Sequence, residues 1–114
     1  MADSLAFTLD CHDPDRLAEF WALALGYERA GGVQQYRVLV HPDRTQPKML
    51  LQQVPEAKTT KNRLHLDLHV ADPETFADQL VAAGATRVQR VDEFGIHWIV
   101  MLDPEGNEFC LVVS

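Results

Sequence analysis

Two stretches of the sequence follow the same pattern: LAFTLDCHDPDRLAEFWALALGYERA (5–30) and LHLDLHVADPETFADQLVAAGATRVQ (64–89). Each begins with alternating apolar and polar residues, continues through Asp-Pro into an amphipathic segment, and then reaches a glycine. The two Asp-Pro pairs begin at Asp13 and Asp72, 59 residues apart. This match suggests that a structural unit occurs twice in the chain.

A second match supports the duplication. The stretch HPDRTQPKMLLQQV (41–54) resembles LDPEGNEFCLVV (102–113), with Asp43 and Asp103 60 residues apart. Chance could supply one such match, but matches in the same order at nearly one offset indicate an internal repeat. The sequence therefore predicts two related modules, 4–54 and 64–113, joined by a polar linker, 55–63, within one domain, 1–114.

Each module reads as one strand, one helix and three further strands. Asp13 and Asp72 are suited to cap a helix at its N-terminus, with proline in the next position. Gly26 and Gly84 are suited to end those helices. The predicted strands are 5–11, 27–30, 34–41 and 48–54 in the first module and 64–70, 86–92, 96–102 and 108–113 in the second. The predicted apolar helix faces comprise Leu17, Phe20, Trp21 and Ala24, and Phe76, Leu80 and Val81.

Composition narrows the possible functions. The 114 residues carry a net charge of −7, which opposes binding to nucleic acid or to an anionic membrane. No apolar run approaches the roughly 20 residues of a membrane span. No secretory signal is visible and two cysteines form no disulfide framework, so we expect a cytoplasmic protein. Cys11 and Cys110 are expected to be small buried hydrophobic residues.

The alternation along strand 64–70 assigns side chains to faces. Its leucines belong to one face, while His65, Asp67 and His69 share the other. Three polar residues on one strand face predict a cleft lining or a solvated surface. Trp98 alternates with its neighbours in the same way, but the sequence leaves open whether it faces this cleft or the core.

The repeated module and three motifs resemble the vicinal oxygen chelate superfamily, which includes glyoxalase I, extradiol dioxygenases, fosfomycin-resistance enzymes and bleomycin-binding proteins. The motifs are Phe20-Trp21 followed by Leu25-Gly26, the stretch KNRLHLD (61–67), and DPEGNEF (103–109). The resemblance implies an α+β fold, with two tandem βαβββ modules forming one glyoxalase-like domain with a half-open barrel cleft. It also implies a small-molecule ligand and a homodimer.

In metal-using members of that superfamily, four ligands come from equivalent strands of the two modules. Carried over to this chain, the positions hold Ala6, Lys48, His65 and Glu108. Alanine has no donor atom and a protonated lysine repels a cation, so the resemblance implies a degenerate site. A divalent ion (Zn, Ni, Mn or Fe) held by His65 and Glu108, with Asp67 as a third ligand, remains an alternative to no cofactor at all.

Each candidate residue also has a structural interpretation. His65 and Glu108 are the candidate catalytic residues, Glu108 as a general base; His65 could instead be structural, and Glu108 could pair with Lys48. Asp67 could orient a histidine or form a salt bridge with Lys61 or Arg63.

Four residues are candidate ligand contacts: Lys48, Arg63, Asp67 and Trp98. The linker cations, among them Lys58, could attract an anion or could be solvated, and Trp98 could be core.

Two functions follow from these residues. The first is a small-molecule binding protein of the glyoxalase/bleomycin-resistance type that works without metal. The second is a lyase, isomerase or dioxygenase that uses a divalent ion or Glu108 as base. Glyoxalase I activity itself is not expected, because it needs the missing ligands. The only serines are Ser4 and Ser114, which argues against a serine hydrolase.

Overall fold

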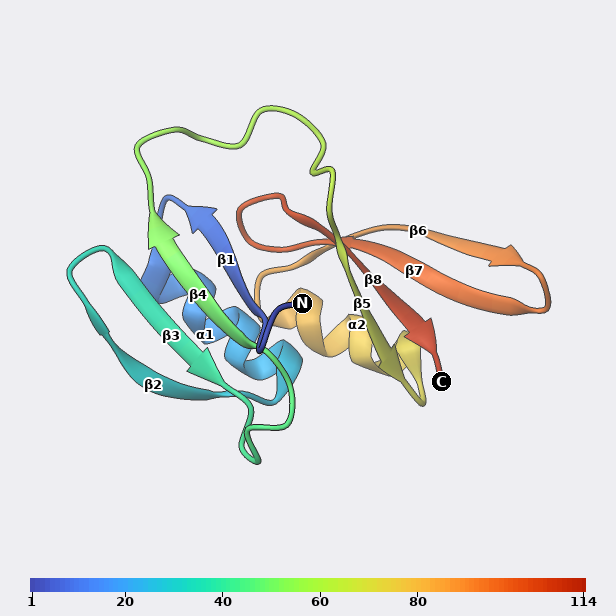
Figure 1. Ribbon diagram of the computed structural model, residues 1–114. Coiled ribbons are helices and arrows are strands. Elements are labelled where there is room, and N and C mark those ends of the chain that lie inside the picture. The colour runs from blue at the N-terminus through green and yellow to red at the C-terminus, as the bar shows by residue number, and fades with distance from the viewer. The chain divides into compact units, whose positions relative to one another are not determined.

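The computed structural model describes residues 1–114 and divides into two compact units, Met1–Ala57 and Lys58–Ser114. Each unit contains one helix and one four-stranded sheet (Figure 1). The first contains β1 (Ala6–Cys11), α1 (Pro14–Leu25), β2 (Glu28–Val33), β3 (Tyr36–Val40) and β4 (Lys48–Gln53). The second contains β5 (Leu66–Val70), α2 (Pro73–Ala82), β6 (Thr86–Glu93), β7 (Ile96–Leu102) and β8 (Glu108–Val113).

The two units have the same topology. Their sheets have strand orders β1-β4-β3-β2 and β5-β8-β7-β6. In each sheet the first strand runs parallel to the last, and the other neighbours are antiparallel. The predicted α+β fold of two tandem βαβββ modules is therefore confirmed.

Both helices begin as the sequence predicts. Asp13 accepts a hydrogen bond from the Arg16 N–H at 3.2 Å, and Asp72 accepts one from the Thr75 N–H at 3.2 Å. Each aspartate satisfies a backbone donor that the first helical turn leaves without a partner. Neither helix is long and apolar enough to cross a bilayer.

The helix ends differ from one another. Helix α1 ends at Gly26, whose left-handed backbone (φ 68°) suits glycine. Helix α2 is instead capped by Ala83 with φ −92°, and Gly84 follows at φ 115°. The prediction that Gly84 ends the helix was therefore displaced by one residue.

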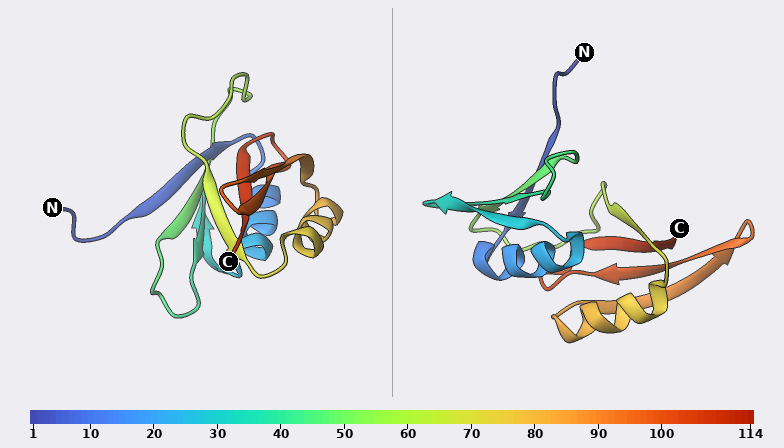
Figure 2. Two further views of the ribbon diagram at one scale, coloured as in Figure 1. Left: turned by 90° about the vertical axis from the view of Figure 1, so that its right-hand side faces the viewer. Right: turned by 90° about the horizontal axis from the view of Figure 1, so that it is seen from below.

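The core of each unit lies between the helix and one face of the sheet. Helix α1 packs against β3 and β4, and α2 packs against β6, β7 and β8 (Figure 2). The predicted face of α1 is confirmed, since all four of its residues are buried. The predicted face of α2 is partly wrong: Val81 is 45% exposed, and Ala77 is buried with Leu80. Ala77 lies three residues before Leu80 and so shares its side of the helix.

Candidate functional site

The site begins with the parallel pairing of β5 and β8. Asp67 is the register partner of Cys110, and Leu66 is the partner of Phe109. His65 comes one residue before Leu66, and Glu108 comes one residue before Phe109. The strand pairing therefore brings His65 and Glu108 to the same end of the sheet. Side chains alternate between faces along a strand. The polar side chains of β5 therefore share a face with Glu108 and Cys110.

That face, which lies away from α2, forms a cavity of about 530 Å³ within the second module. One part of its lining is apolar and comes from β6, β7 and β8. The other part is polar and comes from β5, β8, the segment before β5 and Gln89 of β6. The lining residues are Lys61, His65, Asp67, His69, Gln89, Val91, Ile96, Trp98, Val100, Glu108, Cys110 and Val112.

The structure settles which face of β7 carries Trp98. Trp98 lines the cavity with Ile96 and Val100, whereas Ile99 and Met101 are fully buried on the other face. Trp98 pairs with Val91 on β6 and Val112 on β8, which line the same cavity. The indole thus forms part of an aromatic and aliphatic wall, as the cleft-facing alternative predicted.

His65, Asp67 and Cys110 form a cluster on the cavity lining. Their potential ligand atoms all lie within 4.8 Å of one another. His65 Nδ1 is 3.1 Å from Asp67 Oδ1, so Asp67 pairs with this histidine rather than with Lys61 or Arg63. Burial, together with the charge of Asp67 and a hydrogen bond to it, raises the pKa of the Cys110 thiol.

Glu108 is held by the segment that precedes β5. Its carboxylate accepts hydrogen bonds from Lys58 Nζ at 3.0 Å and from the Asn62 N–H at 2.9 Å. Only 16% of the Glu108 side chain and 21% of the Lys58 side chain are exposed. Burial alone would raise the pKa of Glu108, but these two donors outweigh it and the pKa lies below the usual glutamate value.

The same segment joins the two motifs that support the resemblance. Asn62 Nδ2 donates to Asn107 Oδ1 at 3.0 Å, and Asn107 Nδ2 donates to both carboxylate oxygens of Asp103. Asp103 is only 2% exposed and also accepts from the Glu105 and Asn107 N–H groups. The DPEGNEF stretch therefore carries Glu108 and also holds Asn62, one of the two residues that bind the Glu108 carboxylate.

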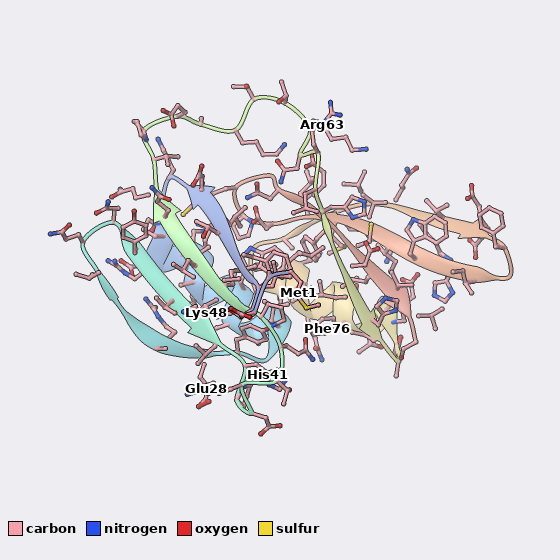
Figure 3. All side chains as sticks on the ribbon, in the orientation of Figure 1. Met1, Glu28, His41, Lys48, Arg63 and Phe76 are labelled. Atoms are coloured by element: carbon pink, nitrogen blue, oxygen red, sulfur yellow. The ribbon has the colours of Figure 1, made fainter.

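The structure brings together four of the six predicted site residues. His65, Asp67, Trp98 and Glu108 all line the cavity. Arg63 is exposed on the segment leading into β5 and does not line it (Figure 3). Lys48 belongs to the first module, where it is the register partner of Ala6 and borders a separate hollow of about 400 Å³ with His41 and Arg44. The pairing of Lys48 with Glu108 remains a prediction.

Sequence reasoning missed three residues of this site. Cys110 was expected to be only a buried hydrophobic residue, and Lys58 and Asn62 were treated as linker. The alternation along 108–113 already places Cys110 on the Glu108 face, so that signal was available. The contacts of Lys58 and Asn62 depend on the path of the linker, which no periodicity specifies.

Comparison with known proteins agrees with this architecture. Residues 6–112 match the model of the glyoxalase-like domain family, and the chain belongs to that family. Its superfamily is the glyoxalase/bleomycin resistance/dioxygenase (vicinal oxygen chelate) superfamily. A search of curated proteins finds no match.

Solved structures share the fold at low sequence identity. A glyoxalase/bleomycin resistance protein/dioxygenase family enzyme from Burkholderia phytofirmans has a TM-score of 0.83 and 17% identity over 98% of each chain. A hypothetical protein from S. aureus has a TM-score of 0.79 and 21% identity, covering 100% of this chain and 95% of its own. The fosfomycin resistance protein FosX from Listeria monocytogenes has a TM-score of 0.81 and 10% identity, covering 100% and 94%. A mutant of that protein was crystallised with Mn(II) and dihydroxypropylphosphonic acid.

The residues at the superfamily's ligand positions do not fit a four-ligand metal ion. Ala6 and Lys48 are register partners on β1 and β4, and they correspond to His65 and Glu108 at the same end of β5 and β8. Neither Ala6 nor Lys48 supplies a donor for a cation. Glu108 already neutralises Lys58. Divalent sites usually take three or more protein ligands, whereas of these four residues only His65 and Glu108 carry donor atoms for a cation, and Glu108 is paired with Lys58.

Proposed function

We propose that this protein binds a small organic molecule in the cavity on the β5–β8–β7–β6 face, without a metal ion at the four positions used by its superfamily. The cavity volume of about 530 Å³ lies within the range of about 300–1,000 Å³ typical of ligand sites. The observation that carries the proposal is the lining itself, in which an apolar wall around Trp98 adjoins the polar cluster at His65. Ligand sites commonly combine these two features.

The lining favours a flat ligand with a polar end. The Trp98 indole and the aliphatic side chains of Val91 and Val112 suit an aromatic or planar group. His65 offers a ring nitrogen, and Lys61 offers an ammonium donor and a positive charge. A planar molecule that carries a carboxylate, a 2-oxo group or a phenolic oxygen would match both halves of the cavity.

The proton-transfer alternative is less well supported. A general base needs a carboxylate that can approach the substrate and accept a proton near neutral pH. The Glu108 carboxylate is occupied by Lys58 and Asn62, and its pKa is lowered rather than raised. Glu108 is thus better suited to hold the segment before β5 than to move a proton.

Thermal-shift screening tests the proposal. Aromatic antibiotics, aromatic carboxylates and 2-oxo compounds are screened, and a ligand at 100 times its Kd should stabilise the protein by about 2.7 kcal/mol. Trp98→Ala should remove most of this stabilisation. Phe94→Ala is the matched control, because Phe94 lies in the same β6–β7 hairpin, is 91% exposed and does not line the cavity. Equal loss in both variants, or full binding by Trp98→Ala, would contradict the proposal.

The homodimer implied by the family resemblance belongs to the same proposal. Sedimentation velocity of the purified protein should give a species of twice the chain mass of 12.9 kDa. A monomer at all accessible concentrations would contradict this part and leave the cavity assignment untouched.

A further inference from the structure

We propose that His65, Asp67 and Cys110 together form a binding site for a divalent transition metal of the zinc type. This set shares only His65 with the superfamily's ligand positions, because Asp67 and Cys110 lie elsewhere on β5 and β8. The inference does not rest on the proposed small-molecule function, since metal binding can be measured without any organic ligand.

The spacing of the three donors suits one ion. Zinc binds nitrogen and oxygen donors at about 2.0–2.2 Å and thiolate sulfur at about 2.3 Å, so tetrahedral donors are roughly 3.3–3.6 Å apart. His65 Nδ1 and Asp67 Oδ1 are already 3.1 Å apart, and all three donor atoms lie within 4.8 Å. Small side-chain rotations therefore suffice to close the site, with no movement of the sheet.

The backbone holds these donors in place. Asp67 and Cys110 are direct partners in the parallel β5–β8 pairing, and His65 lies two residues before Asp67 on the same face. Sites built on strands position side chains more precisely than sites built on loops. Cys110 is only 9% exposed, while the side chains of His65 and Asp67 are 44% and 49% exposed.

The donor types select the metal. An imidazole, a carboxylate and a thiolate form a mixed set that favours zinc and cobalt over manganese or magnesium, which prefer oxygen. Three protein ligands leave a fourth tetrahedral position, as in catalytic rather than structural zinc sites. All three residues line the cavity, so that position would be accessible to a molecule bound there.

The charges balance when the ion binds. The Cys110 thiol loses its proton to solvent, because a thiol binds zinc as the thiolate. One thiolate and one carboxylate then offset the two positive charges of the ion, and the neutral imidazole adds a third donor. Lys61 lines the same cavity and is the cation that opposes binding, but it is exposed to solvent.

Titration of the purified, metal-free protein with Co(II) tests the site. We expect one bound ion per chain, a thiolate-to-cobalt charge-transfer band in the near ultraviolet, and displacement of cobalt by Zn(II). Cys110→Ser should remove that band and weaken binding by about 100-fold or more, and His65→Ala should weaken it similarly. The band is read from the unmutated protein, so the test stands even if a variant folds poorly.

Three matched controls sharpen this test. Cys11→Ser changes the other free cysteine, and His69→Ala changes a histidine on the same strand face outside the cluster. Both should bind cobalt within about threefold of the unmutated protein. Glu108→Gln should do the same, and a loss equal to that of Cys110→Ser would place the ion at the superfamily's positions. That result, or bound cobalt without a thiolate band, would overturn the proposal.

Discussion

The two modules share a fold but differ on the open face of the sheet, which is the face that lies away from the helix. Acidic residues in the first turn of each helix form equivalent ion pairs, Asp15 with Arg29 and Glu74 with Arg87. Core positions also correspond at offsets of 59 or 60 residues. The corresponding buried pairs are Ala18 and Ala77, Trp21 and Leu80, Leu39 and Ile99, Met49 and Phe109, and Leu51 and Leu111.

On the open face the correspondence ends. Where the second module pairs Asp67 with Cys110, the first pairs Thr8 with Leu50. Two residues closer to the strand start, the first module has Ala6 beside Lys48, where the second module has His65 and Glu108. The comparison teaches that buried core residues recur in both modules, while the His65–Asp67–Cys110 cluster has Ala6, Thr8 and Leu50 at the corresponding positions of the first module.

The largest expected effect tests the shared core. Leu51→Ala and Leu111→Ala each remove a fully buried side chain from equivalent strands, so each should lower the free energy of unfolding by about 3 kcal/mol. Urea unfolding followed by circular dichroism measures both losses. A loss below about 1 kcal/mol in either variant would contradict the equivalence of the two cores.

The second largest expected effect distinguishes the turn at Asp103 from the corresponding turn at Asp43. Asp103 is buried and accepts several hydrogen bonds, so Asp103→Ala should cost about 2–3 kcal/mol by leaving these donors without a partner. Asp43→Ala changes the sequence counterpart in the first module, which is exposed, and should cost under about 0.5 kcal/mol. Equal losses of unfolding free energy in the same urea assay would contradict the larger contribution that we assign to the Asp103 turn.

A third prediction concerns pH. Since the pKa of Glu108 is lower in the folded protein, its charged form stabilises the fold above the unfolded pKa of about 4.3, and this contribution disappears as pH falls through the folded value. Glu108→Gln should therefore cost about 1.5 kcal/mol at pH 7 and almost nothing at the acid end of the transition. Urea unfolding at a series of pH values measures this gap, and a gap that widens on acidification would have the wrong sign.

The smallest effect concerns the helix caps, where the modules should agree. Asp13→Ala and Asp72→Ala each remove an N-terminal cap, and each should cost about 1 kcal/mol. Replacement of either aspartate by serine should recover most of that loss, because serine also caps helices. Thermal unfolding compares the four variants, and no recovery by serine would argue against a capping role.

The elements were largely predictable because their signals are local. The alternation of strands, the Asp-Pro caps and the apolar stripe of α1 each depend on residues within one or two turns of chain. Val81 was misassigned because periodicity alone places it beside Ala77 and Leu80, whereas it lies in the last turn of α2 and is 45% exposed.

The site was less predictable because its contacts are long-range. His65 and Asp67 were found from one strand, but the position of Cys110 depends on the pairing of β5 with β8, more than 40 residues away. The face of Trp98 similarly required the register of β7 against β8. The partners of Glu108 come from a segment without regular structure, which propensity alone does not place.

The most direct test of the account is a two-dimensional amide NMR titration of the ¹⁵N-labelled protein with the most stabilising ligand from the thermal-shift screen. The indole N–H signal of Trp98 and the amides of His65, Asp67 and Cys110 should shift, while the indole signal of the buried Trp21 stays fixed. Shifts centred instead on Ala6, Thr8 and Lys48, with Trp98 unchanged, would contradict the assignment of binding to the second module.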